Sequence, residues 1–584
     1  MPLIGTAGHV DHGKSTLIQA ITGRNPDRWQ EEQTRGLTID LGFAWTTLPD
    51  GREASFVDVP GHERYLKNML AGIEAIDVAL FVVAADEGWM PQSEEHLAVL
   101  DLLDVSRAVI ALTKVDTVDP ELADVAEVEI EDRLVGTSLE GSPIVRVSGT
   151  EGIGIDILLD ELAAVLPDDP PANGRPRMWV DRSFPVPGAG TVVTGSLLDS
   201  WLAVDDQVVI YPHGATARVR SIQSHEKSSD RVSPGRRVAL NLSGVDHRAV
   251  ERGEMVGLPE QWVLSKRFAA RIRTARFVED FDQRGAYQLH IGSSAHSAVI
   301  TGLEGGAALF ALDRPLALAV GDRFIVRDTG RKLVVAGGTV VDPGPGKTRK
   351  ALARVPGVAA VEPPDAIASR LLAARGTDSL SRLAAHSGGG RPTSALTVGD
   401  TAVDPAFSEQ LTRRAVQLVR EEHLTNPLRP GLPLATLATR LGVTGELAEM
   451  IVDGSTDLRR DGPTVAAFGH EGRLGSDQDA AWKAARDRIE ESLAVPAEND
   501  LGLDPEVLAH LIREGELVRI APGLVYRPKQ LEEIVAVMRG LDAEFTVAEF
   551  RDQVGLSRKY VVPILEWTDK EGLTSRRGDV RHIR

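Results

Sequence analysis

Hydrophobic and polar positions follow three different patterns along the chain, and each pattern predicts a different kind of domain. Residues 1 to about 170 alternate short apolar runs, such as Ala79–Val83 and Ala108–Leu112, with longer mixed segments. This alternation predicts a mostly parallel sheet covered by helices. The longest apolar run, Val78–Ala85, is far shorter than the roughly 20 residues of a membrane helix, so we interpret it as a buried strand.

Short β-rich segments separated by turns begin at about residue 175. Gly190–Gly195 is one of them, and strands at this spacing with glycine punctuation are typical of a closed barrel. A second β-rich stretch runs from about Ser265 to Pro343. The expected domains up to this point are an α/β domain at 1–172 and two small antiparallel β-barrels at 173–260 and 261–345.

After the glycine and proline cluster at 342–346 the pattern becomes helical. Segments of the form helix, turn, helix and short β tail recur with a period of roughly 55 to 65 residues, which predicts serial winged-helix α+β units. The segment 387–392 interrupts the first unit with the composition of a flexible linker. The expected bounds of the units are 346–405, 406–472, 473–528 and 529–584.

Composition narrows the class of protein. The chain has 584 residues, and a prior of about 150 residues per domain agrees with several domains. It has no cysteine, which excludes disulfides, thiol catalysis and thiolate metal sites and fits a reducing cytosol. The first residues show no basic region followed by an apolar one, so we expect no export signal and a cytoplasmic location. The net charge of −20 restricts any RNA contact to a local basic region.

Residues 8–15 read GHVDHGKS and fit the phosphate-loop pattern G-x-x-x-x-G-K-[ST]. In the predicted sheet this loop joins the first strand to the first helix, so its backbone N–H groups face the phosphates. Lys14 then reaches the outer phosphates, and the Ser15 hydroxyl binds Mg²⁺. The alternative is a glycine-rich turn with an incidental lysine. The predicted nucleotide-binding residues of this segment are Gly8, His9, Val10, Asp11, His12, Gly13, Lys14, Ser15 and Thr16.

A second element of a nucleotide switch follows at residues 58–61, which read DVPG. Asp58 ends an apolar strand and can hold Mg²⁺ through a water, while Gly61 can present its N–H to the terminal phosphate. Between the two elements, Thr38 can bring its hydroxyl to the same Mg²⁺, although it also fits an ordinary strand threonine. His62 follows Gly61 and can orient the attacking water, although a histidine at a helix start is often only a surface residue.

A third element, residues 113–116, reads TKVD and predicts a guanine site. The Asp116 carboxylate can accept two hydrogen bonds from guanine that adenine does not offer, and Lys114 can lie against the base or brace the phosphate loop. Ser148 can close the base pocket, although a serine before a glycine is also ordinary loop chemistry. We therefore predict that the chain binds and hydrolyses GTP through Thr113, Lys114, Asp116 and Ser148 together with the two earlier elements.

Four segments, 8–15, 35–40, 58–62 and 86–92, resemble the translational GTPases of the elongation-factor family that carries aminoacyl-tRNA. The resemblance implies that His62 is the catalytic, water-positioning residue and that Asp11 helps to hold a monovalent cation. It implies GTP or GDP, Mg²⁺ and possible monovalent-cation binding as the cofactor set. Thr113 departs from the asparagine usual in the family, which puts one hydrogen bond to the phosphate loop in doubt but not base selection by Asp116.

Within the first predicted barrel, residues 180–184 and 235–241 resemble more narrowly the selenocysteine-specific elongation factors. The resemblance places Asp181, Arg182 and Arg237 at an aminoacyl pocket. A selenol is more acidic than a thiol and is ionised at neutral pH, so two guanidinium groups favour it over a neutral serine. The alternative is that these arginines lie on a solvated barrel face.

The last predicted winged-helix unit carries basic side chains where such units usually contact nucleic acids, at a helix start and at the wing. The alternative, contact with protein or simple spacing, is retained for the acidic inner units. The resemblance to the selenocysteine-specific elongation factors implies that the terminal unit recognises an mRNA hairpin. Few side chains suffice to recognise a hairpin, because its loop bases and backbone shape are exposed. The predicted RNA-binding residues are Ser557, Arg558, Lys559 and Tyr560 at the helix and Arg576 and Arg577 on the wing.

These observations predict a multidomain fold with an α/β P-loop GTPase domain, two antiparallel β-barrels and a C-terminal array of winged helices. The predicted function is GTP-dependent delivery of selenocysteinyl-tRNA to the ribosome at UGA codons marked by an mRNA hairpin (SECIS), with hydrolysis releasing the tRNA. We expect a monomer without membrane contact. One rival is the elongation-factor-like GTPase of a sulfate-activating complex, which predicts no tandem winged helices. Another is a GTP-gated nucleic-acid tether without tRNA cargo.

Overall fold

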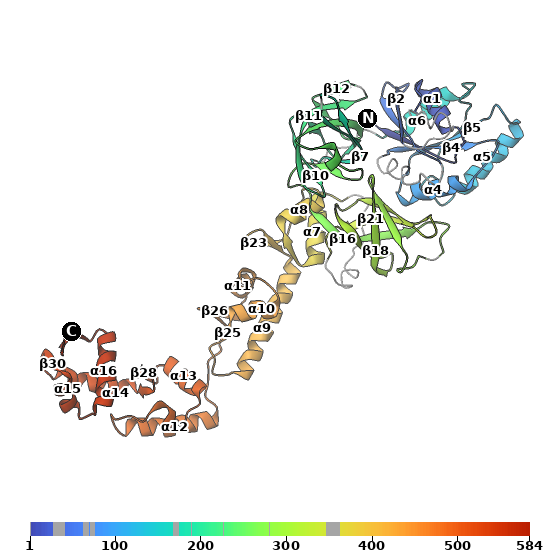
Figure 1. Cartoon of the computed structure of the whole chain (residues 1–584). Helices are drawn as coiled ribbons and strands as arrows, with labels where there is room; N and C mark the ends of the chain where they lie inside the picture. The colour runs from blue at the N-terminus through green and yellow to red at the C-terminus, as the bar shows by residue number, and fades with distance from the viewer. Residues whose placement is uncertain are drawn as a thin grey trace. The chain divides into compact units, whose positions relative to one another are not determined.

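The chain forms two compact units, residues 1–405 and 406–584. Figure 1 shows the α/β domain, the two barrels and a short helical module of the first unit, and the winged-helix modules of the second. No helix in the described ranges is long and apolar enough to cross a membrane. The structure, a computed structural model, describes residues 2–26, 41–61, 69, 76–167, 174–188, 190–225, 227–279, 281–345 and 362–584.

The α/β domain is built on a six-stranded sheet with the order β2-β3-β1-β4-β5-β6. Only β2 runs antiparallel to its neighbour, so the prediction of a mostly parallel sheet is confirmed. β4 is buried along its whole length, as expected for a central parallel strand. The strands are β1 (Leu3–Ala7), β2 (Gly42–Thr47), β3 (Glu53–Asp58), β4 (Val78–Ala84), β5 (Ala108–Thr113) and β6 (Ile144–Arg146), and the described helices are α1 (Lys14–Thr22), α4 (Pro91–Leu102), α5 (Pro120–Leu134) and α6 (Ile155–Val165).

The first barrel is a closed ring of six antiparallel strands, because β10 pairs with both β15 and β11. β12 (Lys227–Ser229) extends the edge of β11, and β9 (Leu202–Ala203) pairs with β13 (Arg231–Val232). The prediction of a closed barrel is confirmed. Its strands are β7 (Arg177–Val186), β8 (Gly190–Leu198), β10 (Gln207–Tyr211), β11 (Ala215–Ser224), β14 (Arg236–Ser243) and β15 (Met255–Gly257).

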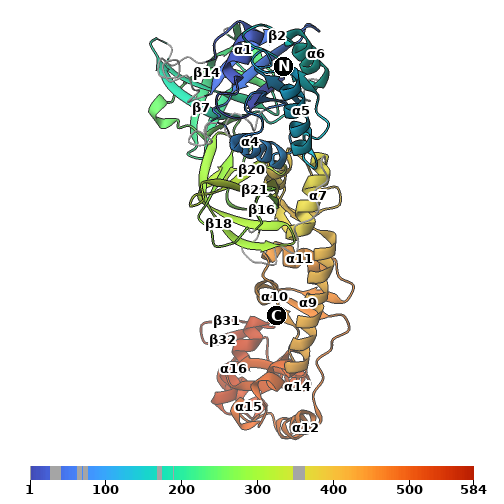
Figure 2. The same cartoon turned by 90° about the vertical axis from the view of Figure 1, so that its right-hand side faces the viewer.

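The second barrel is also closed, with the order β16-β19-β18-β17-β20-β21. Phe268, Phe310 and Phe324 pack in its core, with the Phe268 and Phe310 rings stacked at 4.9 Å between centroids. α4 of the α/β domain contacts β21, and Figure 2 shows it beside β20 and β21. The strands are β16 (Leu264–Thr274), β17 (Tyr287–Ile291), β18 (Ser294–Glu304), β19 (Ala307–Ala317), β20 (Arg323–Asp328) and β21 (Leu333–Asp342).

The module that follows the second barrel is a shortened winged helix. No helix is formed between α8 and β23, where a complete unit would have its third helix. Gly388 and Gly389 adopt φ of 89° and 97°, which ends α8 and turns the chain away. The segment is also fixed rather than linker-like, since Arg391 N donates to Asp365 Oδ1 at 2.8 Å. The elements are α7 (Pro364–Arg375), β22 (Thr377–Ser379), α8 (Leu380–Ser387), β23 (Leu396–Val398) and β24 (Thr401–Val403).

The second unit begins with a complete winged helix, in which three helices pack with a three-stranded sheet of order β25-β27-β26 and the strand β25 lies between the first and second helices. Thr444 caps α11 by accepting a hydrogen bond from Leu447 N at 3.3 Å. The winged-helix prediction is confirmed here. The elements are α9 (Pro405–Thr425), β25 (Leu432–Pro433), α10 (Leu434–Leu441), α11 (Gly445–Asp453), β26 (Leu458–Asp461) and β27 (Thr464–Ala467).

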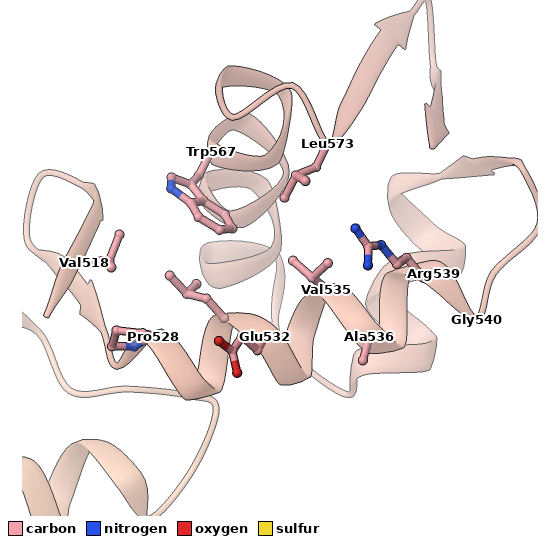
Figure 3. Close-up of a pocket in the computed structure, with 10 residues that line it drawn as sticks. Val518, Pro528, Glu532, Val535, Ala536, Arg539, Gly540, Trp567 and Leu573 are labelled. Carbon is pink, nitrogen blue, oxygen red and sulfur yellow. The ribbon is translucent and has the colours of Figure 1, made fainter. Parts of the chain in front are cut away.

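The last two modules share one hydrophobic core, which runs from Leu428 to Ile583. A groove of about 780 Å³ lies where they meet. Figure 3 shows Val518 from the third module and Trp567 and Leu573 from the fourth lining it beside α14. The elements of the third module are α12 (Ser476–Glu490), α13 (Pro505–Arg513), β28 (Val518–Ala521) and β29 (Leu524–Tyr526), and those of the fourth are α14 (Pro528–Arg539), β30 (Glu544–Thr546), α15 (Val547–Val554), α16 (Arg558–Lys570), β31 (Thr574–Arg577) and β32 (Val580–Ile583).

Candidate functional site

The phosphate loop joins β1 to α1 and adopts a backbone that depends on its glycines. Gly13 has φ of 86° directly before α1, and Gly8 has φ of 125°. A Cβ at Gly8 would lie 2.1 Å from the carbonyl oxygen of Val82 on β4, so no larger residue fits there. Asp11 also adopts a left-handed conformation, with φ of 63°. The loop therefore wraps closely over the end of the sheet.

Lys14 lies inside this loop. Its Nζ donates to the carbonyl oxygen of Gly8 at 3.1 Å and to that of His9 at 2.5 Å. Burial lowers the pKa of Lys14 to about 8, although the carboxylates of Asp58 and Asp11 act in the opposite direction. An anionic phosphate beside Lys14 would stabilise its charged form.

Asp58 and Ser15, the two predicted Mg²⁺ residues within the described ranges, lie in direct contact. Ser15 Oγ donates to Asp58 Oδ2 at 2.6 Å, and Thr6 Oγ1 donates to Asp58 Oδ1 at 2.9 Å. The same Thr6 oxygen accepts from Val59 N at 3.0 Å. Sequence reasoning missed Thr6, which fixes the direction of the Asp58 carboxylate.

Gly61 lies directly against the phosphate loop. A Cβ at this position would be 2.5 Å from Lys14 Nζ and 2.7 Å from Val10 N, so the backbone of residue 61 approaches the loop as only glycine permits. Thr38 and His62 lie outside the described residues. Within the described ranges there is no cluster of three or more His, Asp or Glu side chains placed to hold a metal ion.

Thr113 braces the phosphate loop even though it replaces the expected asparagine. Its Oγ1 donates to the carbonyl oxygen of His12 at 2.7 Å, across 101 residues of sequence. The hydrogen bond that the sequence put in doubt is therefore present, because a hydroxyl can donate where an amide would.

The other predicted guanine-site residues take different environments. Lys114 has φ of 57°, and its Nζ pairs with Asp86 and Glu87, each at 3.2 Å. Asp116 is exposed. Ser148 is buried and accepts from Glu151 N at 3.1 Å. A Cβ on the neighbouring Gly149 would lie 3.4 Å from Thr16 Cγ2, so this loop lies beside the start of α1.

Two side chains of α4 support the phosphate loop and were missed from sequence. His96 Nδ1 accepts from Gly8 N at 2.9 Å, and Gln92 Oε1 accepts from Val10 N at 3.1 Å. Burial lowers the pKa of His96 to about 3, so the ring is neutral and Nδ1 stays an acceptor. Two sequence signals could have found them: Gln92 ends the segment 86–92 that resembles the translational GTPases, and His96 follows it by one helical turn.

The predicted aminoacyl residues surround a β-bulge in the first barrel. Val180 pairs with Gly195 and Arg182 with Thr194, so Asp181 is the extra residue of the bulge. Arg237 Nη2 donates to both carboxylate oxygens of Asp181, at 2.9 and 2.8 Å, and Thr194 Oγ1 donates to Asp181 Oδ1 at 2.5 Å. The Asp181 and Arg237 side chains are only 11% and 18% exposed. This burial excludes the alternative of a fully solvated face for these two residues.

Arg182 lies next to Asp181 on β7 and reaches the α/β domain. Its Nη2 donates to the carbonyl oxygen of Leu41 at 3.1 Å. The guanidinium of Arg237 also lies 3.6 Å from the ring centroid of Phe43 on β2. The Asp181 carboxylate offsets one of the two guanidinium charges of Arg182 and Arg237, so these three side chains together carry one net positive charge.

The predicted RNA-binding side chains are mostly exposed. Ser557, Arg558 and Lys559 stand at the start of α16, and Tyr560 is half-buried beneath Lys559, whose Nζ lies 5.5 Å from the ring centroid. In contrast, Arg581 on β32 of the same module is buried, and its Nε donates to Asp569 Oδ2 at 3.0 Å. Arg576 and Arg577 are exposed at the end of β31, beside the wing turn.

Three known protein-family models match segments of the chain. Family models match for the elongation factor Tu GTP binding domain at residues 1–168, for the selenocysteine-specific elongation factor β-barrel domain at 268–347, and for the elongation factor SelB winged helix at 537–583.

Three similar proteins match this chain along nearly its whole length. The selenocysteine-specific elongation factor of Desulfomicrobium baculatum is 32% identical over 100% of both chains. That of Escherichia coli (strain K12) is 31% identical over 100% of this chain and 98% of the relative. A crystal structure of a bacterial selenocysteine-specific elongation factor, EF-Sec, has a TM-score of 0.69 and 29% identity and covers 100% of this chain and 99% of that chain. The chain therefore belongs to the family of selenocysteine-specific elongation factors and is a GTPase.

Proposed function

We propose that this GTPase delivers selenocysteinyl-tRNA to the ribosome at UGA codons marked by an mRNA hairpin, and that GTP hydrolysis releases the tRNA. The buried pair of Asp181 and Arg237 in the first barrel is the observation that carries this proposal. Ribosome binding, a monomeric state and a cytoplasmic location belong to the same proposal.

Selenocysteine recognition rests on charge. A selenolate carries a full negative charge, whereas a seryl group is neutral, so a partly buried net positive charge favours the selenolate. Asp181 fixes the direction of the Arg237 guanidinium through two hydrogen bonds, which leaves its other donors in a defined place. Arg182 supplies the second guanidinium.

For the nucleotide, the proposed contacts follow the loop geometry. Backbone N–H groups of residues 8–16 bind the phosphates, and Lys14 reaches the outer ones. Asp116 selects guanine, with Thr113, Lys114 and Ser148 shaping the base site. His62 orients the attacking water, and Gly61 donates to the terminal phosphate.

Mg²⁺ is assigned to Ser15, Thr38 and, through a water, Asp58. The 2.6 Å hydrogen bond between Ser15 Oγ and Asp58 Oδ2 supports this assignment, because two oxygens of the kind that Mg²⁺ prefers already converge. The bound cation would neutralise charge on the phosphate oxygens. Asp11 stays the proposed contact of a monovalent cation.

Hairpin binding is assigned to Ser557, Arg558, Lys559 and Tyr560 with Arg576 and Arg577. Their exposure at a helix start and beside a wing turn supports it. The rival GTPase of a sulfate-activating complex predicted no tandem winged helices, and the family assignment removes it.

The cargo is tested with Arg237→Gln. We expect this variant to lose at least tenfold in affinity for selenocysteinyl-tRNA while its affinity for the same tRNA charged with serine changes little. Arg218→Gln is the matched control, since Arg218 is an exposed arginine of the same barrel. Equal affinity of the unaltered protein for both charged tRNAs would refute the proposed cargo, and an unchanged Arg237→Gln variant would remove Arg237 from the pocket. The rival tether without tRNA cargo predicts that the unaltered protein binds neither charged tRNA.

A further inference from the structure

Asp86 and Glu87 are two acidic residues just beyond the carboxyl end of β4, in the segment 86–92 that resembles the translational GTPases. Ala84, the last residue of β4, pairs in parallel with Thr113, the last residue of β5. The two acids therefore lie at the same edge of the sheet as the proposed guanine site. Carboxylates at this edge repel the phosphates of a nucleotide, so their presence indicates a different function.

Both acids bind the ammonium group of Lys114. Lys114 Nζ donates to Asp86 Oδ2 and to Glu87 Oε1, each at 3.2 Å. Burial acts to lower the pKa of Lys114, but the hydrogen bonds to the two carboxylates raise it overall, so the amine is charged at neutral pH. A lysine side chain without such partners samples many rotamers. The two carboxylates fix its far end.

The backbone of Lys114 is fixed as well. Its φ of 57° lies in the left-handed region, which a residue with a side chain adopts only when its surroundings hold it there. The carbonyl oxygen of Lys114 accepts from Thr117 N at 3.0 Å and from Thr117 Oγ1 at 2.8 Å. The preceding residue, Thr113, donates to the carbonyl oxygen of His12. Protein groups alone therefore hold both ends of the Lys114 methylene chain.

Glu87 also faces the phosphate loop. Its Oε2 lies 3.7 Å from Nε2 of His12, whose ring is fully buried and whose Nδ1 lies 3.3 Å from the carbonyl oxygen of Val82. Burial lowers the pKa of His12 to about 4, so the ring is neutral at neutral pH and this contact is not an ion pair. One oxygen of Glu87 thus binds Lys114 while the other contacts the phosphate loop, which relates the position of the lysine to that of the loop.

We propose that Asp86 and Glu87 are positioning residues for the guanine base: they hold the Lys114 side chain in the conformation in which its methylene stem lies against the base. This inference rests on the proposed contact of Lys114 with guanine. A side chain that is ordered before its ligand arrives loses little conformational entropy on binding, so the ligand binds more tightly. The gain applies to ligands that carry the base and not to phosphate groups alone.

The test compares GDP with inorganic pyrophosphate as ligands of the full chain. In the double variant Asp86→Asn and Glu87→Gln we expect GDP to bind about fivefold more weakly, the scale of ordering one long side chain. Pyrophosphate has no base, and its affinity should stay unchanged or rise, because two negative charges near the site have been removed. That result also shows that the phosphate loop is folded. Titration calorimetry measures GDP binding, and competition with GDP measures pyrophosphate binding.

Lys114→Met provides a double-mutant cycle, because methionine keeps a linear apolar side chain but has no ammonium group. We expect this variant to bind GDP more weakly than the unaltered protein. Adding the double substitution to Lys114→Met should not weaken GDP binding further, since the amides then replace acids that have no ammonium group to hold. Asp50→Asn is the matched control: Asp50 pairs with Arg52 of the same domain at 2.6 Å, and its loss should leave GDP affinity unchanged.

Three outcomes overturn the inference. The first is a double variant that binds GDP as tightly as the unaltered protein or more tightly. The second is an equal loss of GDP affinity with and without Lys114→Met, because the acids would then act on the fold of the strand ends. The third is an equal loss for pyrophosphate. A Lys114→Met variant with undiminished GDP affinity would refute the proposed contact of Lys114 with guanine as well, and that single measurement distinguishes the two failures.

Discussion

The hydroxyl of Thr113 performs a task that an amide performs in related motifs, and this can be tested by replacing the hydroxyl with a methyl group. Thr113→Val keeps the shape of the side chain but loses the 2.7 Å hydrogen bond to the carbonyl oxygen of His12. A hydrogen bond of this kind contributes about 1 kcal/mol, so we expect GDP to bind roughly fivefold more weakly. Titration calorimetry measures this change.

The matched variants are Thr113→Ser, which keeps the hydroxyl, and Thr113→Asn, which supplies an amide donor. Both should bind GDP within about twofold of the unaltered protein, because a donor remains. A Thr113→Val variant with undiminished GDP affinity would show that the brace is unimportant for binding.

The buried amine of Lys14 gives nucleotide binding a defined pH dependence. In the nucleotide-free protein its pKa is lowered to about 8 by burial, and bound phosphates raise it. Above that pH the free protein must take up a proton when GTP binds, so affinity falls by up to about tenfold per pH unit. Well below it Lys14 is already charged, and this dependence vanishes.

Calorimetry at pH 9 in two buffers with different ionisation enthalpies measures the uptake directly. We expect close to one proton at pH 9 and almost none at pH 6.5 from this group. The Lys14→Met variant, whatever its remaining affinity, should lose the difference between the two pH values. Equal uptake at both pH values would contradict the lowered pKa.

Local motifs were predictable from sequence, whereas the side chains that support them were not. The phosphate loop, Asp58 and Asp116 stand in short patterns whose spacing carries the chemistry. Thr6 and His96 are 52 and 88 residues away from the groups they bind, and only the fold brings them there. The burial of Arg581 against Asp569 likewise depends on the fold and follows from no local pattern.

At the scale of elements, the wing of the last module provides a test of RNA contact. Arg576 and Arg577 are exposed on β31, whereas Arg551 is exposed on α15 and pairs with Asp552 at 2.7 Å. Replacing both wing arginines by alanine should weaken hairpin binding. It should also make the negative slope of log K against log salt shallower by about 2, since each phosphate contact releases about one counterion. Arg551→Ala should leave the slope unchanged.

Hairpin affinity measured at several salt concentrations distinguishes the possibilities. A slope that stays constant in the double variant would remove Arg576 and Arg577 from the interface. A slope that becomes shallower by the same amount in Arg551→Ala as in the double variant would indicate that only the general charge of the module matters.

Periodicity predicted which elements form, and the composition of 387–392 marked the interruption of the first repeat, but it predicted a flexible linker there. The barrels were predictable because a series of short strands with alternating polarity and glycine-containing turns is compatible with few folds other than a closed barrel. The first winged-helix module lacks its third helix because Gly388 and Gly389 turn the chain out of α8, and Gly390 packs so closely on α7 that a Cβ would lie 1.9 Å from the carbonyl oxygen of Pro364. The segment 387–392, whose composition is typical of a flexible linker, thus forms a well-packed turn.

For the molecule as a whole, the division into two compact units predicts where the chain can be cut. The unit 406–584 has its own hydrophobic core, whereas the expected boundary at 528/529 passes through the core shared by the last two modules. Gln530 Nε2 of the fourth module donates to the carbonyl oxygen of Ile489 of the third module at 2.7 Å. The third and fourth modules therefore depend on each other for stability.

We expect the fragment 406–584 to unfold in urea at a concentration close to that of the same unit in the full chain, and to bind the hairpin with unchanged affinity. The fragment 529–584 keeps every predicted RNA-binding side chain but exposes the apolar face of α14, including Leu531 and Ile534, which are buried in the shared core. Burial of such side chains contributes about 1.5–3 kcal/mol each, so this fragment should unfold at markedly lower urea. Circular dichroism gives both midpoints, and equal midpoints for the two fragments would show that the shared core does not couple the modules.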